Sequence, residues 1–163
     1  MKKILLISDT HGYIDEKIIK YANKVDEIWH AGDIGDISVT DKLKKIKPLK
    51  AVYGNIDDHK IRAEFPLHNR FICEKVDVWI THIGGYPKRY NPNIIEELKS
   101  NPPNLFICGH SHILKVINDK ELDLLHINPG AIGKHGLHRV RTMIQFEISG
   151  KKIENLSVIE FKR

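Results

Sequence analysis

Seven side chains that could bind a divalent metal ion follow the ends of five short apolar runs. The runs end at residues 7, 29, 53, 80 and 108. Short apolar runs flanked by glycine and turn residues are typical of buried parallel strands, and open α/β sheets bind ligands beyond the carboxyl ends of such strands. If the strands are neighbours, all seven side chains share one rim: Asp9, His11, Asp33, Asn55, His82, His110 and His112.

Two of the spacings suit a shared metal ion. In Asp9-x-His11 and in His110-x-His112 the two side chains lie on the same side of an extended segment, because strand side chains alternate with a period of two. Each pair alone has an ordinary alternative, since Asp9 could cap a turn and the histidines could be polar surface residues. The complete set, at five predicted strand ends, favours a metal site over these alternatives.

The donor types indicate which ions would bind. Imidazole, carboxylate and amide donors without a thiolate suit manganese, nickel, zinc, iron or cobalt, and they disfavour calcium, which prefers oxygen ligands alone. Seven ligands exceed what one catalytic ion needs while it keeps a coordination position open. We therefore predict two divalent ions that share a bridging carboxylate, with manganese as the first choice.

Periodicity predicts the elements that position these side chains. Apolar residues at helical spacing predict helices over 15–25 and 38–46, the second ending before Pro48 because the residue preceding proline avoids helical geometry. Residues 57–69 and 84–90 are interpreted as loops over the same rim. The remaining segments are a strand from Leu49, strands over 71–74 and 76–81, a helix over 93–100, and hairpins of 113–117 with 122–127 and of 139–148 with 152–161. Five parallel-type strands followed by two hairpins predict an α/β fold, a four-layer αββα sandwich of two stacked mixed β-sheets flanked by helices.

The composition predicts one domain. A chain of 163 residues that is 41% hydrophobic is long enough for one well-packed domain and short for two. It contains no linker-like tract, so we predict a single domain over 1–163. The formal charge of +5 is scattered along the chain, and the one dense basic run, residues 42–47, is typical of a solvated helix face rather than of a nucleic-acid patch.

Cysteine use and hydropathy bear on the compartment. Cys73 and Cys108 are the only cysteines, and their spacing predicts neither a disulfide framework nor a thiolate zinc site, so we interpret both as buried thiols. The first apolar run is shorter than the core of a signal peptide, and no apolar stretch approaches the roughly 18 residues that span a membrane. We therefore predict a cytoplasmic protein without a membrane partner.

The ordered motifs resemble those of a known family. Asp9-x-His11, Gly32-Asp33, Gly54-Asn55, Thr81-His82 and Gly109-His110-Ser111-His112 are similar, in this order and spacing, to the calcineurin-like metallophosphoesterase superfamily. The short chain and Asn128-Pro129-Gly130 resemble its small bacterial and archaeal phosphodiesterase branch. The motifs extend over about four fifths of the chain, from Asp9 to Gly130.

The resemblance implies an activity and a division of the ligands. It implies that Asp33 bridges two ions, one held by Asp9, His11 and His112 and the other held by Asn55, His82 and His110. The implied enzyme is a metal-dependent phosphodiesterase or phosphatase that hydrolyses a small phosphoester through a hydroxide bridging the two metals. Asp33, Asn55 and His82 are then the central catalytic residues.

One position departs from the family pattern, and two further residues are candidates for substrate binding. Many phosphatases of the superfamily have a histidine after the Gly-Asn pair to protonate the leaving group, whereas this chain has Ile56. Asp57 is the nearest candidate acid, with a helix cap or loop role as its alternative.

His135 and Arg139 could contact the substrate phosphate, with ordinary surface charge as the alternative.

Two other function classes fit the sequence less well than the enzyme. A non-catalytic metal-binding scaffold for protein–protein recruitment is similar to the retromer scaffold subunit, but in that protein the ligand set is eroded and here it is complete. A nuclease gains support from the positive charge, but the chain has no capping domain and no concentrated basic surface for nucleic acid. An exposed edge strand or apolar face would also allow a homodimer or higher homo-oligomer.

Overall fold

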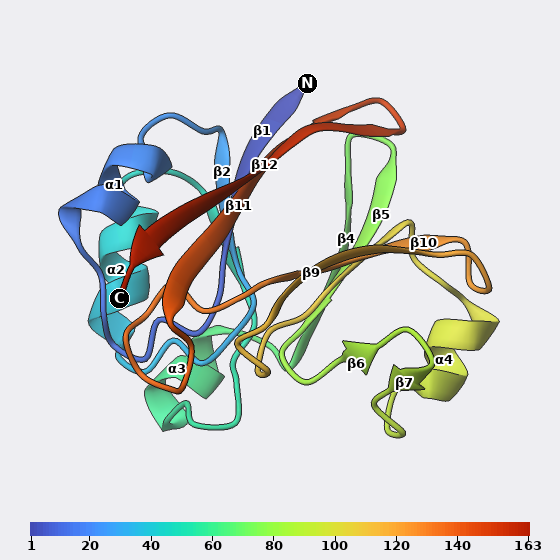
Figure 1. Cartoon of the computed structure of the whole chain (residues 1–163), viewed down its shortest axis with the longest axis horizontal. Coiled ribbons are helices and arrows are strands. Elements are labelled where there is room, and N and C mark those ends of the chain that lie inside the picture. Colours follow the sequence, from blue (N-terminus) through green and yellow to red (C-terminus); the bar gives the residue numbers. More distant parts are fainter.

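Two five-stranded sheets form the centre of the computed structural model, which describes residues 1–163 (Figure 1). The first sheet contains β1 (Lys2–Ile7), β2 (Glu27–His30), β3 (Leu49–Ala51), β11 (Val140–Ser149) and β12 (Lys152–Lys162). The second contains β4 (His68–Cys73), β5 (Val76–Thr81), β8 (Leu105–Ile107), β9 (Leu114–Asp119) and β10 (Leu124–Pro129). A small separate hairpin pairs β6 (Gly85–Tyr86) with β7 (Arg89–Tyr90).

Both sheets are mixed. In the order β12-β11-β1-β2-β3, the strands β1, β2 and β3 are parallel, β11 is antiparallel to β1, and β12 is antiparallel to β11. In the order β4-β5-β8-β10-β9, the strands β5, β8 and β10 are parallel and the edge strands β4 and β9 are antiparallel. The five strands that precede the candidate ligands are therefore divided, three in one sheet and two in the other.

Four helices cover the outer faces of the sheets. They are α1 (Glu16–Ala22), α2 (Ile37–Lys44), α3 (His59–Glu64) and α4 (Ile95–Ser100). Figure 1 shows α1, α2 and α3 on the outer side of the first sheet and α4 beyond the second sheet. No helix of the structure is both long enough and apolar enough to cross a membrane.

Strand alternation builds three apolar layers between these elements. Ile4 and Leu6 of β1 face a core between the two sheets, whereas Leu5 and Ile7 face the core beneath α1, α2 and α3, because successive strand side chains point to opposite faces. A smaller core packs Leu98 of α4 against the second sheet. These layers confirm the predicted αββα sandwich.

The structure corrects two predicted loops. Residues 59–64 form α3, because the Asp58 side chain accepts a hydrogen bond from the Ile61 N–H and caps the helix. Only Ile61 of this helix is buried, so it has no apolar periodicity that sequence analysis could detect. Residues 84–90 contain the β6–β7 hairpin. Cys73 and Cys108 are buried and free, as predicted.

Candidate metal centre

The predicted metal-binding side chains lie together at the carboxyl ends of their strands, where the two sheets face each other. Three donors, from Asp9, His11 and His112, lie within 4.8 Å of one another. A second group of three, from Asp33, His82 and His110, meets the same limit. Each group combines residues from both sheets, since Asp9 and Asp33 follow strands of the first sheet and His82, His110 and His112 follow strands of the second.

Asp33 lies between the two groups. Its Oδ2 is 3.4 Å from Nε2 of His11 and 3.2 Å from Nε2 of His82. Oδ1 of Asn55 is 3.0 Å from Nδ1 of His110, so the amide belongs with the second group. Within the first group, Oδ1 of Asp9 is 3.2 Å from Nε2 of His112.

The donor atoms fit divalent cations because several of them are buried without a partner. Oδ1 of Asp9, Nε2 of His11 and Nε2 of His82 have no hydrogen bond and no solvent contact, whereas buried polar atoms in proteins are normally paired. Nδ1 of His82 is 2.7 Å from the carbonyl oxygen of Ala31. Because a carbonyl only accepts, Nδ1 carries a proton, and Nε2 is the ring nitrogen that is left to bind a metal.

The backbone at the site is left-handed at five of the seven positions. The φ angles are positive at Asp9 (54°), His11 (44°), Asp33 (53°), His110 (70°) and His112 (61°). Aspartate and histidine tolerate this region better than most residues, and hydrogen bonds hold two of these backbones, from Asp9 N–H to Gly32 O and from His11 N–H to Asp33 O. Concentrated strain of this kind is typical of functional sites.

Charge interactions shift the pKa values of these groups in opposite directions. Burial raises the pKa of Asp33, but its interactions with His11 and His82 outweigh burial and hold the net pKa below its usual range. Asp33, and then Asp9, raise the pKa of His11 to about 9. Burial lowers the pKa of His82, yet the same two carboxylates produce a net increase. A divalent cation would displace protons from these imidazoles, because metals bind the neutral ring.

His30 holds the backbone of the site rather than contacting the candidate ligands. Its Nδ1 accepts a hydrogen bond from Gly32 N–H (3.1 Å), so Nε2 donates to Oγ1 of Thr10 (3.0 Å). The hydroxyl of Thr10 in turn donates to the carbonyl of Ile34. The ring is fully buried, and burial lowers the pKa of His30 to about 4. His30 therefore fixes the turns that carry Asp9 and Asp33.

Asp57, the candidate acid, is fully engaged by backbone groups. Its two carboxylate oxygens accept hydrogen bonds from the N–H groups of Ile34 (3.1 Å), Gly35 (2.8 Å) and Gly54 (2.8 Å). Both oxygens are directed toward these backbone groups, and the residue is only 4% exposed. This arrangement supports a role in joining the turns after β2 and β3 and argues against proton donation.

The loop after β10 approaches the first ligand group. The imidazole of His135 stacks on that of His11, with ring centroids 4.7 Å apart and an interplanar angle of 24°. Arg139 is exposed and has no ion pair or hydrogen bond. Two residues that sequence analysis missed lie nearby: His138, whose ring is 5.3 Å from that of His112, and the buried Arg141. The only local signal for Arg141 was a charged residue within an apolar strand.

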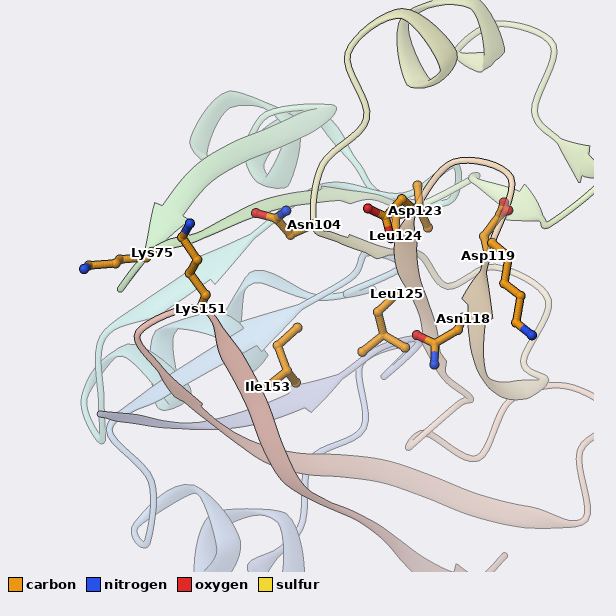
Figure 2. A pocket seen from close by; sticks show the side chains of 10 residues that line it. Lys75, Asn104, Asn118, Asp119, Asp123, Leu124, Leu125, Lys151 and Ile153 are labelled. Carbon is orange, nitrogen blue, oxygen red and sulfur yellow. The ribbon is translucent and has the colours of Figure 1, made fainter.

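A cavity of about 680 Å³ lies at the amino ends of the strands, away from the candidate metal centre. Asn104 and Leu124, at the amino ends of β8 and β10, line it (Figure 2). Asp119 also lines it, but its carboxylate accepts hydrogen bonds from the Tyr90 hydroxyl and from two backbone N–H groups of the β9–β10 turn. Neither metal-binding group borders this cavity.

Comparison with known sequences identifies the family. The calcineurin-like phosphoesterase superfamily domain matches residues 1–151, which include every candidate ligand. The chain belongs to the calcineurin-like phosphoesterase superfamily. A probable metallophosphoesterase from Methanocaldococcus jannaschii is 31% identical over 134 residues, which are 77% of this chain and 66% of the relative, slightly less than two thirds of its length. Another, from Mycoplasma pneumoniae, is 29% identical over 138 residues, which are 76% of this chain and 81% of the relative.

Solved structures share the superfamily fold over nearly the whole chain. Vps29 from Chaetomium thermophilum aligns with a TM-score of 0.77 at 18% identity and covers 99% of this chain and 97% of its own. A structure described as a novel archaeal phosphodiesterase aligns with a TM-score of 0.71 at 21% identity and covers 96% of this chain and 99% of its own. At these identities the likeness establishes the fold.

Proposed function

We propose that this chain is a phosphodiesterase that depends on two divalent metal ions, manganese being the first choice, and hydrolyses a small phosphoester. The observation that carries the proposal is the set of three buried atoms without partners, Asp9 Oδ1, His11 Nε2 and His82 Nε2, around the carboxylate of Asp33. Buried donors and acceptors need partners, and cations would supply them. Membership in a superfamily of phosphoesterases supports the same chemistry.

The two groups of donors divide the proposed ligands. Asp9, His11 and His112 would hold one ion; Asn55, His82 and His110 would hold the other; and Asp33, within reach of both groups, would serve both. Bound there, divalent ions would lower the pKa of a water molecule and polarise the phosphoryl oxygens. The hydrogen bond from His82 to the Ala31 carbonyl orients the imidazole for this task.

The loop after β3 supports a diester with a good leaving group. Ile56, where many phosphatases of the superfamily have a histidine, is 47% exposed and cannot transfer a proton. Asp57 uses both carboxylate oxygens as backbone acceptors. A leaving group that departs from this site therefore receives no proton from either side chain, which favours an ester whose alcohol is a weak base.

Hydrolysis of two chromogenic esters tests the proposal. Metal-stripped protein is assayed with bis(p-nitrophenyl) phosphate and with p-nitrophenyl phosphate, and manganese, nickel, zinc or magnesium is then added back. We expect metal-dependent turnover with a preference for the diester. Metal content measured by mass spectrometry should approach two ions per chain.

Matched variants separate loss of the centre from loss of the fold. Asp33→Asn and His82→Ala should each reduce turnover of the diester by roughly 100-fold or more, whereas Asn118→Ala, at an exposed position on β9, should not. If protein with two bound ions hydrolyses neither ester, the enzyme is excluded and the scaffold interpretation takes its place. Preference for the monoester would contradict the interpretation of Ile56.

A further inference from the structure

A second cavity, of about 320 Å³, opens directly onto the candidate metal centre. We refer to it as the side pocket; its walls include Tyr53, Arg62, Leu67, His68, Ile83 and Asn93. Asn55 and His82, which belong to the second ligand group, also line it. Its volume is at the lower end of small-ligand sites, so it has room for one ring-containing group.

Apolar and aromatic surface forms much of the side pocket. Leu67 and Ile83 are 47% and 41% exposed, which is high for large apolar side chains, and Ile94 is buried beneath them. The Tyr53 ring forms a further wall, and the guanidinium of Arg62 lies 4.8 Å from its centroid. Exposed apolar side chains that border a polar site are typical of a surface that a ligand covers.

Two polar side chains of the side pocket have no hydrogen-bond partner in the protein. His68 and Asn93 are exposed and neither side chain makes a hydrogen bond. The neighbouring Asn91, in contrast, is fully used: it donates to the Ile83 carbonyl and accepts from the Asn93 N–H. The side pocket therefore combines a loop that the hydrogen bonds of Asn91 hold in place with the free hydrogen-bonding groups of His68 and Asn93.

Arg62 brings a fixed positive charge to the boundary between the side pocket and the metal centre. Its Nε donates to the Asp57 carbonyl (2.7 Å) and its Nη2 donates to the Asn55 carbonyl (3.1 Å). It has no carboxylate partner. A guanidinium held in this way attracts a phosphate and can stack on a flat ring.

We propose that the side pocket binds the nucleoside of a phosphodiester substrate. This inference rests on the proposed function and specifies its substrate class. A nucleobase is flat, presents apolar faces to Leu67, Ile83 and Tyr53, and offers hydrogen-bonding edges to His68 and Asn93. A purely alkyl group would leave both polar side chains unpaired in the covered pocket, which costs binding energy.

Binding of thymidine to metal-free protein tests the side pocket without any catalysis. NMR titration of the full chain should show saturable shifts at the pocket residues. Asn93→Ala should raise the dissociation constant for thymidine by roughly three- to tenfold, which is the effect of losing one hydrogen bond. Asn118→Ala, which replaces an exposed asparagine outside the side pocket, should leave this dissociation constant unchanged. No saturable binding at millimolar thymidine would overturn the inference.

Kinetics with manganese-loaded protein test the same pocket during turnover. The p-nitrophenyl diester of thymidine 5′-phosphate should exceed the p-nitrophenyl diester of methyl phosphate in kcat/KM by roughly tenfold, because one apolar face is buried. Asn93→Ala and Leu67→Ala should reduce this ratio mainly through KM.

Outcomes for the function and for the side pocket can be told apart. Equal kcat/KM values for the two esters, or a preference for the methyl over the thymidine ester, would overturn the nucleoside assignment while the phosphodiesterase activity stands. Binding of thymidine without hydrolysis of any ester would overturn the substrate role together with the proposed function.

Discussion

The backbone at Gly54 passes so close to Asp33 that no side chain fits between them. A Cβ atom at position 54 would lie 2.1 Å from Oδ1 of Asp33 and 2.3 Å from its backbone nitrogen. The same Oδ1 accepts a hydrogen bond from Ile56 N–H. The loop after β3 thus holds one carboxylate oxygen and directs the other, Oδ2, between His11 and His82.

Replacing Gly54 by alanine therefore tests how tightly the carboxylate of Asp33 is positioned. Because backbone or carboxylate must shift, Gly54→Ala should destabilise the protein by about 1–3 kcal/mol and should also weaken manganese binding. Urea denaturation and calorimetric titration measure the two effects. Gly150→Asn is the control, since a Cβ at this turn meets no atom and asparagine tolerates the positive φ of 59° at this position. If Gly54→Ala binds manganese as tightly as the wild type does, the close approach of the Gly54 backbone to Asp33 is not needed for metal binding.

Arg141 shows how an element far from the ligands in sequence positions them. From β11, its Nε donates to the Ile132 carbonyl (2.7 Å) and its Nη2 donates to Oδ2 of Asp15 (3.1 Å). Asp15 caps α1 by accepting from Ile18 N–H. The N–H of Gly133 donates to the carbonyl of Asp9 (3.1 Å), so the segment that Arg141 holds supports the end of β1.

Arg141→Met should lower the free energy of unfolding by about 2 kcal/mol, because it removes charge-assisted hydrogen bonds from a buried position. A double-mutant cycle with Asp15→Asn should show a coupling of about 1 kcal/mol, since the carboxylate is only partly buried. Arg89→Met, at an exposed arginine, provides the matched control. Additive effects of Arg141→Met and Asp15→Asn would contradict the proposed link.

At the scale of the whole molecule, the site exists because the two sheets face each other. Asp9, Asp33 and Asn55 follow strands of the first sheet, whereas His82, His110 and His112 follow strands of the second. The core between the sheets, which includes Ile4, Leu6 and Trp29, sets their separation. Burial in this tightly packed molecule also shifts the pKa values of histidines outside the ligand groups.

Burial of His126 makes the protein less stable in acid. Burial and, to a smaller extent, the charge of Lys115 lower the pKa of His126 from 6.5 to about 4. Between these values the unfolded chain binds more protons than the folded one, so stability falls as the pH falls from 6.5 to 4. The full difference amounts to about 3 kcal/mol.

A His126→Gln variant isolates this effect, because glutamine does not titrate. The loss of stability between pH 7 and pH 4 should be smaller in the variant than in the wild type, as measured by urea denaturation at both pH values. His59→Gln, at an exposed position, should lose as much stability between pH 7 and pH 4 as the wild type does. An equal loss in the wild type and in His126→Gln would show that His126 does not destabilise the protein in acid.

Cation binding should stabilise the whole molecule. Ligands that bind only the folded state add about 2.7 kcal/mol at a concentration 100-fold above Kd, which corresponds to a rise in Tm of roughly 5–11 °C for a chain of this size. Calorimetry with manganese and with a chelator should show this difference in the wild type. In Asp33→Asn the difference in Tm between manganese and chelator should be small. The same difference in both proteins would indicate that manganese binds elsewhere.

Much of this fold and site is readable from local sequence. Strand alternation in β1, apolar spacing in α1 and the turns of both hairpins are properties of neighbouring residues, so their approximate positions follow from periodicity. The same holds for the Asp, His and Asn residues that follow the strands, because a residue directly after a strand end must lie at the rim of its sheet.

Other features depend on contacts between distant residues. Only the tertiary structure decided that the five strands divide between two sheets, since hydrophobic periodicity says where a strand runs and not which strand pairs with it. It also decided the roles of Asp57 and Arg141, because each of them has a partner that is far away in the sequence: Ile34 is 23 residues from Asp57, and Asp15 is 126 residues from Arg141. The side pocket is of the same kind, because Tyr53, His68 and Asn93 meet only when both sheets and α4 are in place.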